Sequence, residues 1–306
     1  MKINPIYKKE LKISARSKKT ALILLGYNTL LAIFGLFAFY ITFDSAIQNG
    51  RDVDYSDMLR IYSIIAGIGF GLVLLIVPAL TAGSISGERE KQTLEILLTT
   101  KESTLGIVLG KLASSISVIL LLAFSGLPIL SLVFAIGGVT FLNLCQFILL
   151  IFVTAIFVGS IGVFFSVLLK KTTASTVTTY SAILILIVVT FAILLAIYTI
   201  IGLKQGNKYE GIFTEYENAS LGNTIFLLLI NPAITFFTML REQVGDQAPV
   251  LYLIDSSTNA GSNFILNNWF YVSLITQAII SVFLMAGAAK LLDPLSKRPS
   301  KSHKTK

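Results

Sequence analysis

The sequence predicts an all-α membrane protein with several spans, and two observations lead to that class. Of its 306 residues, 55% are hydrophobic and only 13% are charged, with a mean hydropathy of +0.82. A soluble domain carries about 25% charged residues, so this chain holds half the usual share. Six apolar runs are long enough for a helix to cross the ~30 Å hydrocarbon core of a bilayer. The six predicted spans are 20–43, 61–86, 105–136, 141–169, 176–203 and 265–292.

Before the first span, residues 1–19 predict a short helix that lies at the membrane surface. Asn4 can cap this helix, with Pro5 at the first helical position. One side is apolar, and the other carries cations that can reach anionic headgroups. These cations are Lys8, Lys9, Lys12, Arg16 and Lys19. The alternative that stays open is a basic tail that does no more than follow the charge rule of membrane proteins.

The loops alternate in charge, which predicts the orientation of the chain. Residues 1–19 hold seven Lys or Arg against one acid, and 290–306 hold six against one. By contrast, 44–60 hold four Asp against two Arg, and 204–262 hold six acids against three bases. Because cationic loops stay in the cytoplasm, both termini are predicted to be cytoplasmic. The net charge of +8 follows from this pattern, so no nucleic-acid partner is expected.

Between the fifth and sixth spans, residues 204–262 predict an external loop that contains a broken hydrophobic segment. The stretch 221–240 is apolar enough for a seventh span, but that span would move the lysine-rich tail outside. Pro232 removes a backbone donor and disfavours helix at Asn231. We therefore expect a re-entrant or interfacial hairpin near 221–240 that packs against the spans.

The composition also excludes several classes of site. Cys145 is the only cysteine and His303 the only histidine, so a disulfide framework and a Cys/His metal centre are both excluded. The spans contain almost no ionisable side chains, whereas proton relays and intramembrane hydrolases need them at depth. A stand-alone channel or membrane enzyme is therefore not expected.

One segment does not fit a plain loop between two spans. Residues 84–103, "SISGEREKQTLEILLTTKES", hold four acidic and three basic side chains. They are good helix formers, so a cytoplasmic helix is predicted over 87–104. Polar residues recur every three or four positions on one face, at Glu88, Gln92, Glu95, Thr99 and Glu102. Thr99 or Thr100 is expected to cap the next helix.

The charges of this segment indicate a partner. A basic loop at a membrane surface does not need the acids at 88, 90 and 95, so they suggest that another protein binds there. The alternative is a solvated loop helix.

The stretch "GEREKQTLEILLTTKESTLGIVLGKL", residues 87–112, resembles the signature region of the ABC-2 type transporter permeases. In that family G-E-R-E-x-x-T-L-E-x-L-L-x-T precedes I-V-x-G-K-L. The span order, the N-terminal helix and the Asn-Pro motif agree more loosely over nearly the whole chain. Gln92 replaces a common Gly, which should stiffen the helix. Lys101 replaces a usual Pro, which leaves the cap to Thr100 alone.

The resemblance implies a type V exporter-like fold: six transmembrane helices, an N-terminal interfacial helix and a cytoplasmic coupling helix. It implies a permease subunit in the cell membrane of a bacterium that is not an enzyme and binds no cofactor itself. ATP and Mg²⁺ would belong to a separate ABC ATPase subunit, which grips the coupling helix. Docking is assigned by this resemblance to Glu88, Arg89, Glu90, Thr93, Leu94 and Glu95. Lys111 is expected to anchor the third span to lipid headgroups.

The resemblance also implies two permeases, as two copies or a copy and a homologue, with a path between them. The path would be lined by the first, second and fifth spans, and its candidate residues are Tyr27, Asn28, Tyr62, Ser63, Thr178, Thr179 and Tyr180. A mostly uncharged path fits export of a hydrophobic or amphipathic cargo, such as a drug, a lipid or an antimicrobial peptide. The alternative function is a membrane partner of an ABC ATPase that regulates another membrane or cell-wall process without moving cargo.

Overall fold

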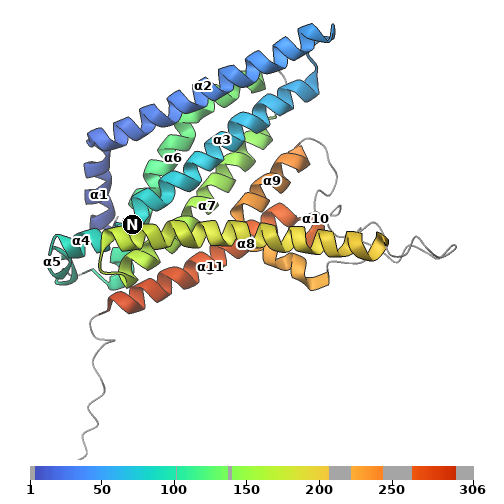
Figure 1. The fold of residues 1–306 in the computed structure, drawn as a ribbon. Helices are drawn as coiled ribbons and strands as arrows, with labels where there is room; N and C mark the ends of the chain where they lie inside the picture. The colour runs from blue at the N-terminus through green and yellow to red at the C-terminus, as the bar shows by residue number, and fades with distance from the viewer. Residues whose placement is uncertain (1–3, 101, 137–139, 207–221, 244–263, 294–306) are drawn as a thin grey trace, which may run out of the picture.

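The computed structural model describes residues 4–100, 102–136, 140–206, 222–243 and 264–293, and every regular element in these ranges is a helix (Figure 1). Within these ranges six helices are long and apolar enough to cross a membrane, which confirms the predicted all-α class with six spans. They are α2 (Lys18–Gln48), α3 (Tyr55–Thr81), α6 (Thr104–Ile136), α7 (Phe141–Leu168), α8 (Thr172–Gly206) and α11 (Trp269–Leu292).

The N-terminal segment is a folded helix, α1 (Pro5–Ala15), and not the basic tail that the sequence left open. Asn4 Oδ1 accepts the backbone N–H of Ile6 at 2.9 Å and so satisfies a donor that the first turn leaves unpaired. The chain then bends, and Ser17 caps α2 by accepting the N–H of Lys19 at 3.2 Å. In Figure 1, α1 therefore runs at a steep angle to α2 and lies against α6.

Helix α7 is the centre of the bundle. It packs against α3, α6, α8 and α11, and it is the most buried of the six spans. Gly162 lets α3 come close, because a Cβ at this position would collide with Thr81. Gly159 does the same for α6, since its Cβ would lie 2.7 Å from Leu112 Cδ1. These small residues allow the close helix contact that holds membrane bundles together.

Helices α2 and α8 are the least buried spans. Helix α2 packs on α3 and α6, whereas α8 packs mainly on α7 and crosses the bundle in Figure 1. Large apolar side chains on both helices are uncovered, among them Leu36 on α2 and Phe191 on α8. These two helices therefore provide the surfaces that lipid or a second copy of the chain can cover.

The stretch around Asn231 forms two short helices, η1 (Gly222–Ile230) and α9 (Pro232–Gln243). Asn231 is 1% exposed, its Oδ1 accepts the N–H of Ala233 at 2.8 Å, and its Nδ2 donates to Thr190 Oγ1 of α8. A second bond joins this segment to α11, because Gln277 Nε2 donates to Thr235 Oγ1 of α9 at 3.0 Å. The break is thus buried and hydrogen-bonded, as a break at membrane depth requires. The re-entrant position itself stays a prediction.

The rest of the predicted external loop, residues 207–221 and 244–263, lies outside the described residues, and so does the lysine-rich tail 294–306. A short helix, α10 (Phe264–Asn267), precedes α11. At the other end of the bundle, α1 lies near the two short helices that connect α3 to α6 (Figure 1). That end contains the charged segment.

Candidate functional site

Residues 82–103, which we call the connector, join α3 to α6 through two short helices. These are α4 (Ser86–Glu90) and α5 (Leu94–Leu98), so the predicted single helix over 87–104 is wrong. The break falls at Gln92, whose φ of 58° lies in the left-handed region. Glycine adopts this region without strain, which explains why Gly is common here in the family. Gln92 therefore does not stiffen a helix; it occupies the turn that ends one.

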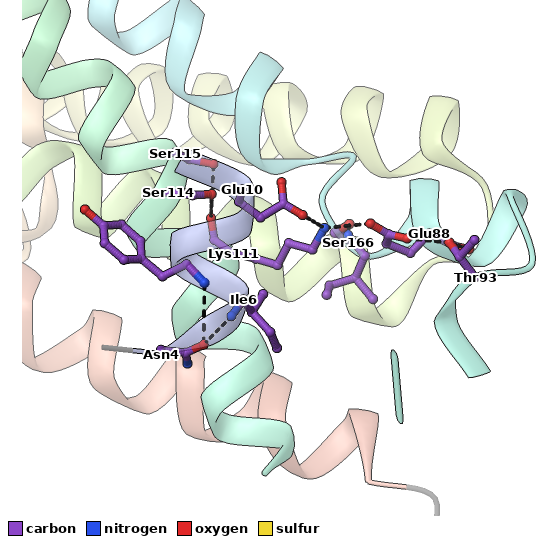
Figure 2. Close-up of polar contacts among 11 residues, drawn as sticks. Asn4, Ile6, Glu10, Glu88, Thr93, Lys111, Ser114, Ser115 and Ser166 are labelled. Atoms are coloured by element: carbon purple, nitrogen blue, oxygen red, sulfur yellow. Dashed lines mark hydrogen bonds and ion pairs between the residues drawn. The ribbon is translucent and has the colours of Figure 1, made fainter. Parts of the chain in front are cut away.

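A buried ammonium fastens α4 to the body of the protein (Figure 2). Lys111 Nζ of α6 lies 2.7 Å from Glu88 Oε1 of α4 and 2.6 Å from Glu10 Oε1 of α1. The Lys111 side chain is only 8% exposed. The expectation that Lys111 reaches lipid headgroups is therefore wrong, because two carboxylates from distant parts of the chain bind its ammonium group instead.

The environment of Glu88 keeps this carboxyl group ionised. Burial alone would raise its pKa, but hydrogen bonds from Lys111 and from the hydroxyl of Thr93 outweigh burial, and the pKa of Glu88 lies below its usual value. A charged Glu88 is what a pairing with an ammonium requires.

The next two residues bind the turn between α7 and α8. Arg89 donates from Nη1 to the carbonyl of Leu169 at 3.0 Å and from Nη2 to that of Val167 at 3.2 Å. Glu90 accepts the backbone N–H of Thr172 at 2.8 Å and its hydroxyl at 2.7 Å. These bonds from Thr172, backbone first and then hydroxyl, lower the pKa of Glu90. The cation is thus at a helix C-terminus and the anion at a helix N-terminus, as the helix dipoles favour.

Ser166 of α7 and apolar packing complete the attachment of the connector. Ser166 Oγ accepts the backbone N–H groups of Ile85 and Ser86, each at 2.9 Å, where α4 begins. Ile85 is 0% exposed and Leu94 of α5 is 8% exposed. Both belong to an apolar cluster that also contains Ile6 of α1. The connector is therefore held by side chains of α6, α7 and α8, and Lys111 links it to α1.

The six predicted docking residues differ in their contacts and in their exposure. Glu88, Arg89, Glu90 and Thr93 make hydrogen bonds within the chain, and Leu94 is buried. Glu90, Thr93 and Glu95 are exposed. Exposed residues near Glu95 in the sequence include Lys91, Gln92, Ile96 and Thr99. We call Glu95 and these four residues the outer edge.

Sequence reasoning missed Ile96, which is 68% exposed. The available signal was an apolar residue two positions after Leu94 in a charged segment, because residues two apart on a helix face different ways. With Leu94 turned inward, Ile96 has to turn out.

The start of α6 also differs from the prediction. Ser103 Oγ accepts the N–H of Gly106 at 3.1 Å, so Ser103 caps this helix. The hydroxyls of Thr99 and Thr100 donate backward instead, to the carbonyls of Ile96 at 2.8 Å and Leu97 at 2.7 Å. The predicted cap at Thr99 or Thr100 is wrong, because these threonines terminate α5. Lys101 lies outside the described residues.

The seven predicted path residues do not form one exposed surface. Tyr27, Tyr62 and Thr179 are 3%, 0% and 0% exposed within the single chain, so they cannot face a path between two copies in this packing. The other four are half-buried, and two of them are hydrogen-bonded to neighbouring helices. Asn28 Nδ2 donates to Ser125 Oγ at 2.9 Å, and Tyr180 OH donates to the carbonyl of Leu75 at 2.6 Å. Ser63 and Thr178 are the remaining two.

These features define a class: a six-span helical membrane protein with a charged connector fastened to the bundle between its second and third spans. Residues 4–292 match the sequence model of the ABC-2 family transporter proteins, and the chain belongs to that family. It is thus a non-catalytic transmembrane subunit of a kind that generally pairs with ABC ATPase subunits. No curated protein matches the chain.

Proposed function

We propose that this protein is the permease subunit of an ATP-driven exporter in the cell membrane of a bacterium, with both termini in the cytoplasm. Separate ABC ATPase subunits bind ATP and Mg²⁺ and dock on the connector. The observation that carries this proposal is the attachment of the connector: α6, α7 and α8 hold it directly and α1 is linked to it through Lys111, while its outer edge is exposed.

Such an attachment suits the transfer of motion. Two ATPase subunits close when they bind ATP, and closure moves the spans only if the connector interacts differently with the two ATPase states. Arg89, Glu90 and Glu88 link the connector to α7, α8 and α6. A force on the outer edge is therefore transmitted to three spans at once. The G-E-R-E motif provides the contacts that transmit it.

The outer edge has the composition of a docking surface. Ile96 is an exposed apolar side chain, and the exposed residues near it in the sequence, Lys91, Gln92, Glu95 and Thr99, are charged or polar. An apolar centre with a polar rim is the usual anatomy of a protein interface. We assign docking to these five residues, and of the six positions named from the family motif they include Glu95. Glu90 and Thr93 are exposed too, but their side chains are hydrogen-bonded within the chain.

The transport path is proposed to lie between two permeases that meet through α2 and α8, the two least buried spans. Their uncovered side chains are mainly apolar, as Leu36 and Phe191 illustrate. This surface fits a hydrophobic or amphipathic cargo, such as a drug, a lipid or an antimicrobial peptide. Tyr27, Tyr62 and Thr179 can join the path only after the helices of one chain separate, because they are buried within it.

Co-purification tests the proposal. The tagged protein is extracted from its native membrane in a mild detergent, and the proteins that elute with it are identified. We expect a stoichiometric ATPase that Glu95→Lys and Ile96→Asp release. Asp52→Lys, a charge reversal at an exposed site at the opposite end of the bundle, is the matched control and should retain it. Release by all three variants, or no ATPase at all, would contradict the docking assignment.

Cargo movement separates the two proposed functions. The complex is reconstituted in vesicles with ATP, and the movement of fluorescent lipid and of a hydrophobic dye is followed. Movement that needs ATP supports an exporter. A docked, active ATPase with no movement of either probe would favour the alternative, a membrane regulator without cargo.

A further inference from the structure

Helix α1 has two opposite sides, and one of them is fastened to α6. Ile6 is 8% exposed on this side. Asn4 Nδ2 donates to the carbonyl of Gly106 at 2.7 Å, and the hydroxyls of Tyr7 and Ser117 lie 3.0 Å apart. Because residues three and four apart share a side of a helix, the next position on this side is 10. Glu10 occupies it and reaches Lys111.

The other side of α1 is exposed and cationic. Lys8, Lys9, Lys12 and Arg16 are all exposed, and they follow one another at helical spacing. Among residues 4–19 the only acid is Glu10, which turns to α6. The exposed side therefore carries positive charge alone. Ile13, which is 55% exposed, lies three positions after Glu10 and three before Arg16, at the border between the two sides.

An anionic lipid surface is the partner that fits this side. Helix α2 begins at Lys18, two residues after Arg16, and α2 is a span, so α1 stays close to the headgroup layer. Amphipathic helices that lie in this layer place cations on phosphates and an apolar side chain at the acyl boundary. Four cations with the exposed Ile13 at their border match that arrangement, since anionic headgroups attract each Lys and Arg.

Lys111 links this lipid-facing helix to the connector. Its ammonium nitrogen bonds Glu10 of α1 at 2.6 Å and Glu88 of α4 at 2.7 Å, and in Figure 2 the two dashed lines meet at that nitrogen. The Lys111 side chain is 8% exposed, so water has little access to it. Two carboxylates share one ammonium, so withdrawal of Glu10 would leave Lys111 paired with Glu88 alone and would break the link between α1 and the connector.

We propose that α1 is a sensor of anionic lipid and that it sets the position of the connector through Lys111. Headgroups on the cationic side hold α1 where Glu10 reaches Lys111, and the connector is then fixed. Without anionic lipid the cations of α1 repel one another, Glu10 withdraws from Lys111, and α1 is no longer tied to the connector, so the distance between α1 and the connector varies. The consequence for ATP-driven transport rests on the function proposed above, whereas the response to lipid belongs to the permease alone.

Electron paramagnetic resonance on the permease without ATPase tests the proposal. Spin labels are placed at Ala15→Cys on α1 and Lys91→Cys on the connector, both exposed positions, in a Cys145→Ser background. The protein is reconstituted in nanodiscs of phosphatidylcholine alone or with phosphatidylglycerol. We expect one narrow distance distribution with phosphatidylglycerol and the loss of that single peak without it. The same distribution in both lipids would overturn the proposal.

Two variants separate the sensor from its link. Glu10→Gln keeps the cations but weakens the bond to Lys111, and the distribution should be broad in both lipids. If Glu10→Gln does not elute like the parent protein, Glu10→Asp, which keeps the charge but shortens the reach, replaces it.

The second variant replaces the four cations together: Lys8→Gln, Lys9→Gln, Lys12→Gln and Arg16→Gln. It should lose the difference between the two lipids. A retained response in this variant would place the lipid site elsewhere and overturn the proposal. A distribution that narrows only when an ATPase is added, whatever the lipid, would replace lipid with a protein as the partner of α1 and would overturn it too.

Discussion

Arg89 and Glu90, neighbours in the sequence, bind opposite ends of two consecutive helices. The guanidinium of Arg89 caps the C-terminal carbonyls of α7, and the carboxylate of Glu90 caps the N-terminus of α8. Each charge has the sign that the helix end favours. A dipeptide of opposite charges thus fixes the α7–α8 turn to the connector, which gives the G-E-R-E motif a role inside the permease.

The first prediction separates docking from coupling. Arg89→Ala removes the bonds to Val167 and Leu169 but leaves the outer edge intact. Hydrogen bonds to charged groups contribute about 1.5–3 kcal/mol, and 1.4 kcal/mol is a factor of ten in an equilibrium. We expect the ATPase to co-purify as before while ATP-driven transport falls about tenfold. Lys290→Ala, an exposed cation on α11 outside the connector, is the control for loss of a cation. Loss of the ATPase with Arg89→Ala would instead make Arg89 a docking residue.

The second prediction concerns the charge balance at Lys111. Lys111→Met leaves Glu10 and Glu88 facing each other without a cation, and removing one partner of a buried ion pair costs about 3–5 kcal/mol. Both carboxylates are partly exposed, so we expect the lower end of that range and a clear fall in the thermal midpoint in detergent. Adding Glu10→Gln and Glu88→Gln should recover most of the loss. A Lys111→Met variant as stable as the parent would show that the Glu10–Lys111–Glu88 cluster contributes little to the stability of the protein.

The third prediction tests the left-handed turn at Gln92. A non-glycine residue in this region costs about 1–2 kcal/mol relative to the ordinary backbone, and glycine avoids that cost. Gln92→Gly should therefore slow trypsin cleavage after Lys91 by about fivefold or more, because the turn opens less often. Gln92→Val should accelerate it, since a β-branched side chain tolerates a positive φ poorly. Equal cleavage rates in all three proteins would mean that the turn is not strained.

Hydropathy predicted the spans well because each span carries apolar side chains along its whole length, both on the side that packs in the bundle and on the uncovered side. The fifth span is instructive, since it begins at Thr172 and not at 176. Its first turn is polar, and Glu90, which lies 82 residues earlier in the chain, caps it. No local pattern contains that contact, so the boundary was placed one turn late.

The connector shows the same limit more strongly. A pattern of helix formers predicted one helix, but the chain turns at Gln92 because Arg89 and Glu90 are held by the α7–α8 turn while Leu94 is packed inward. From the sequence alone, Lys111 was predicted to lie near the start of the third span and to reach the lipid headgroups. Its burial depends on Glu10, 101 positions away, and only the folded arrangement brings the two together.

The last prediction concerns acid. Glu88 and Glu90 both have a pKa below the ordinary 4.5 in the folded connector. Their contribution to its attachment is therefore fully present above pH 4.5 and is lost as the pH falls through the lower folded values. A spin label at Lys91→Cys in the Cys145→Ser background should be immobile at neutral pH and become mobile below that point. Glu90→Gln should make part of this mobility independent of pH, and a label at Gln48→Cys, at the end of α2, should not respond. A connector that loosens as the pH rises instead would contradict the ionised state of both carboxylates.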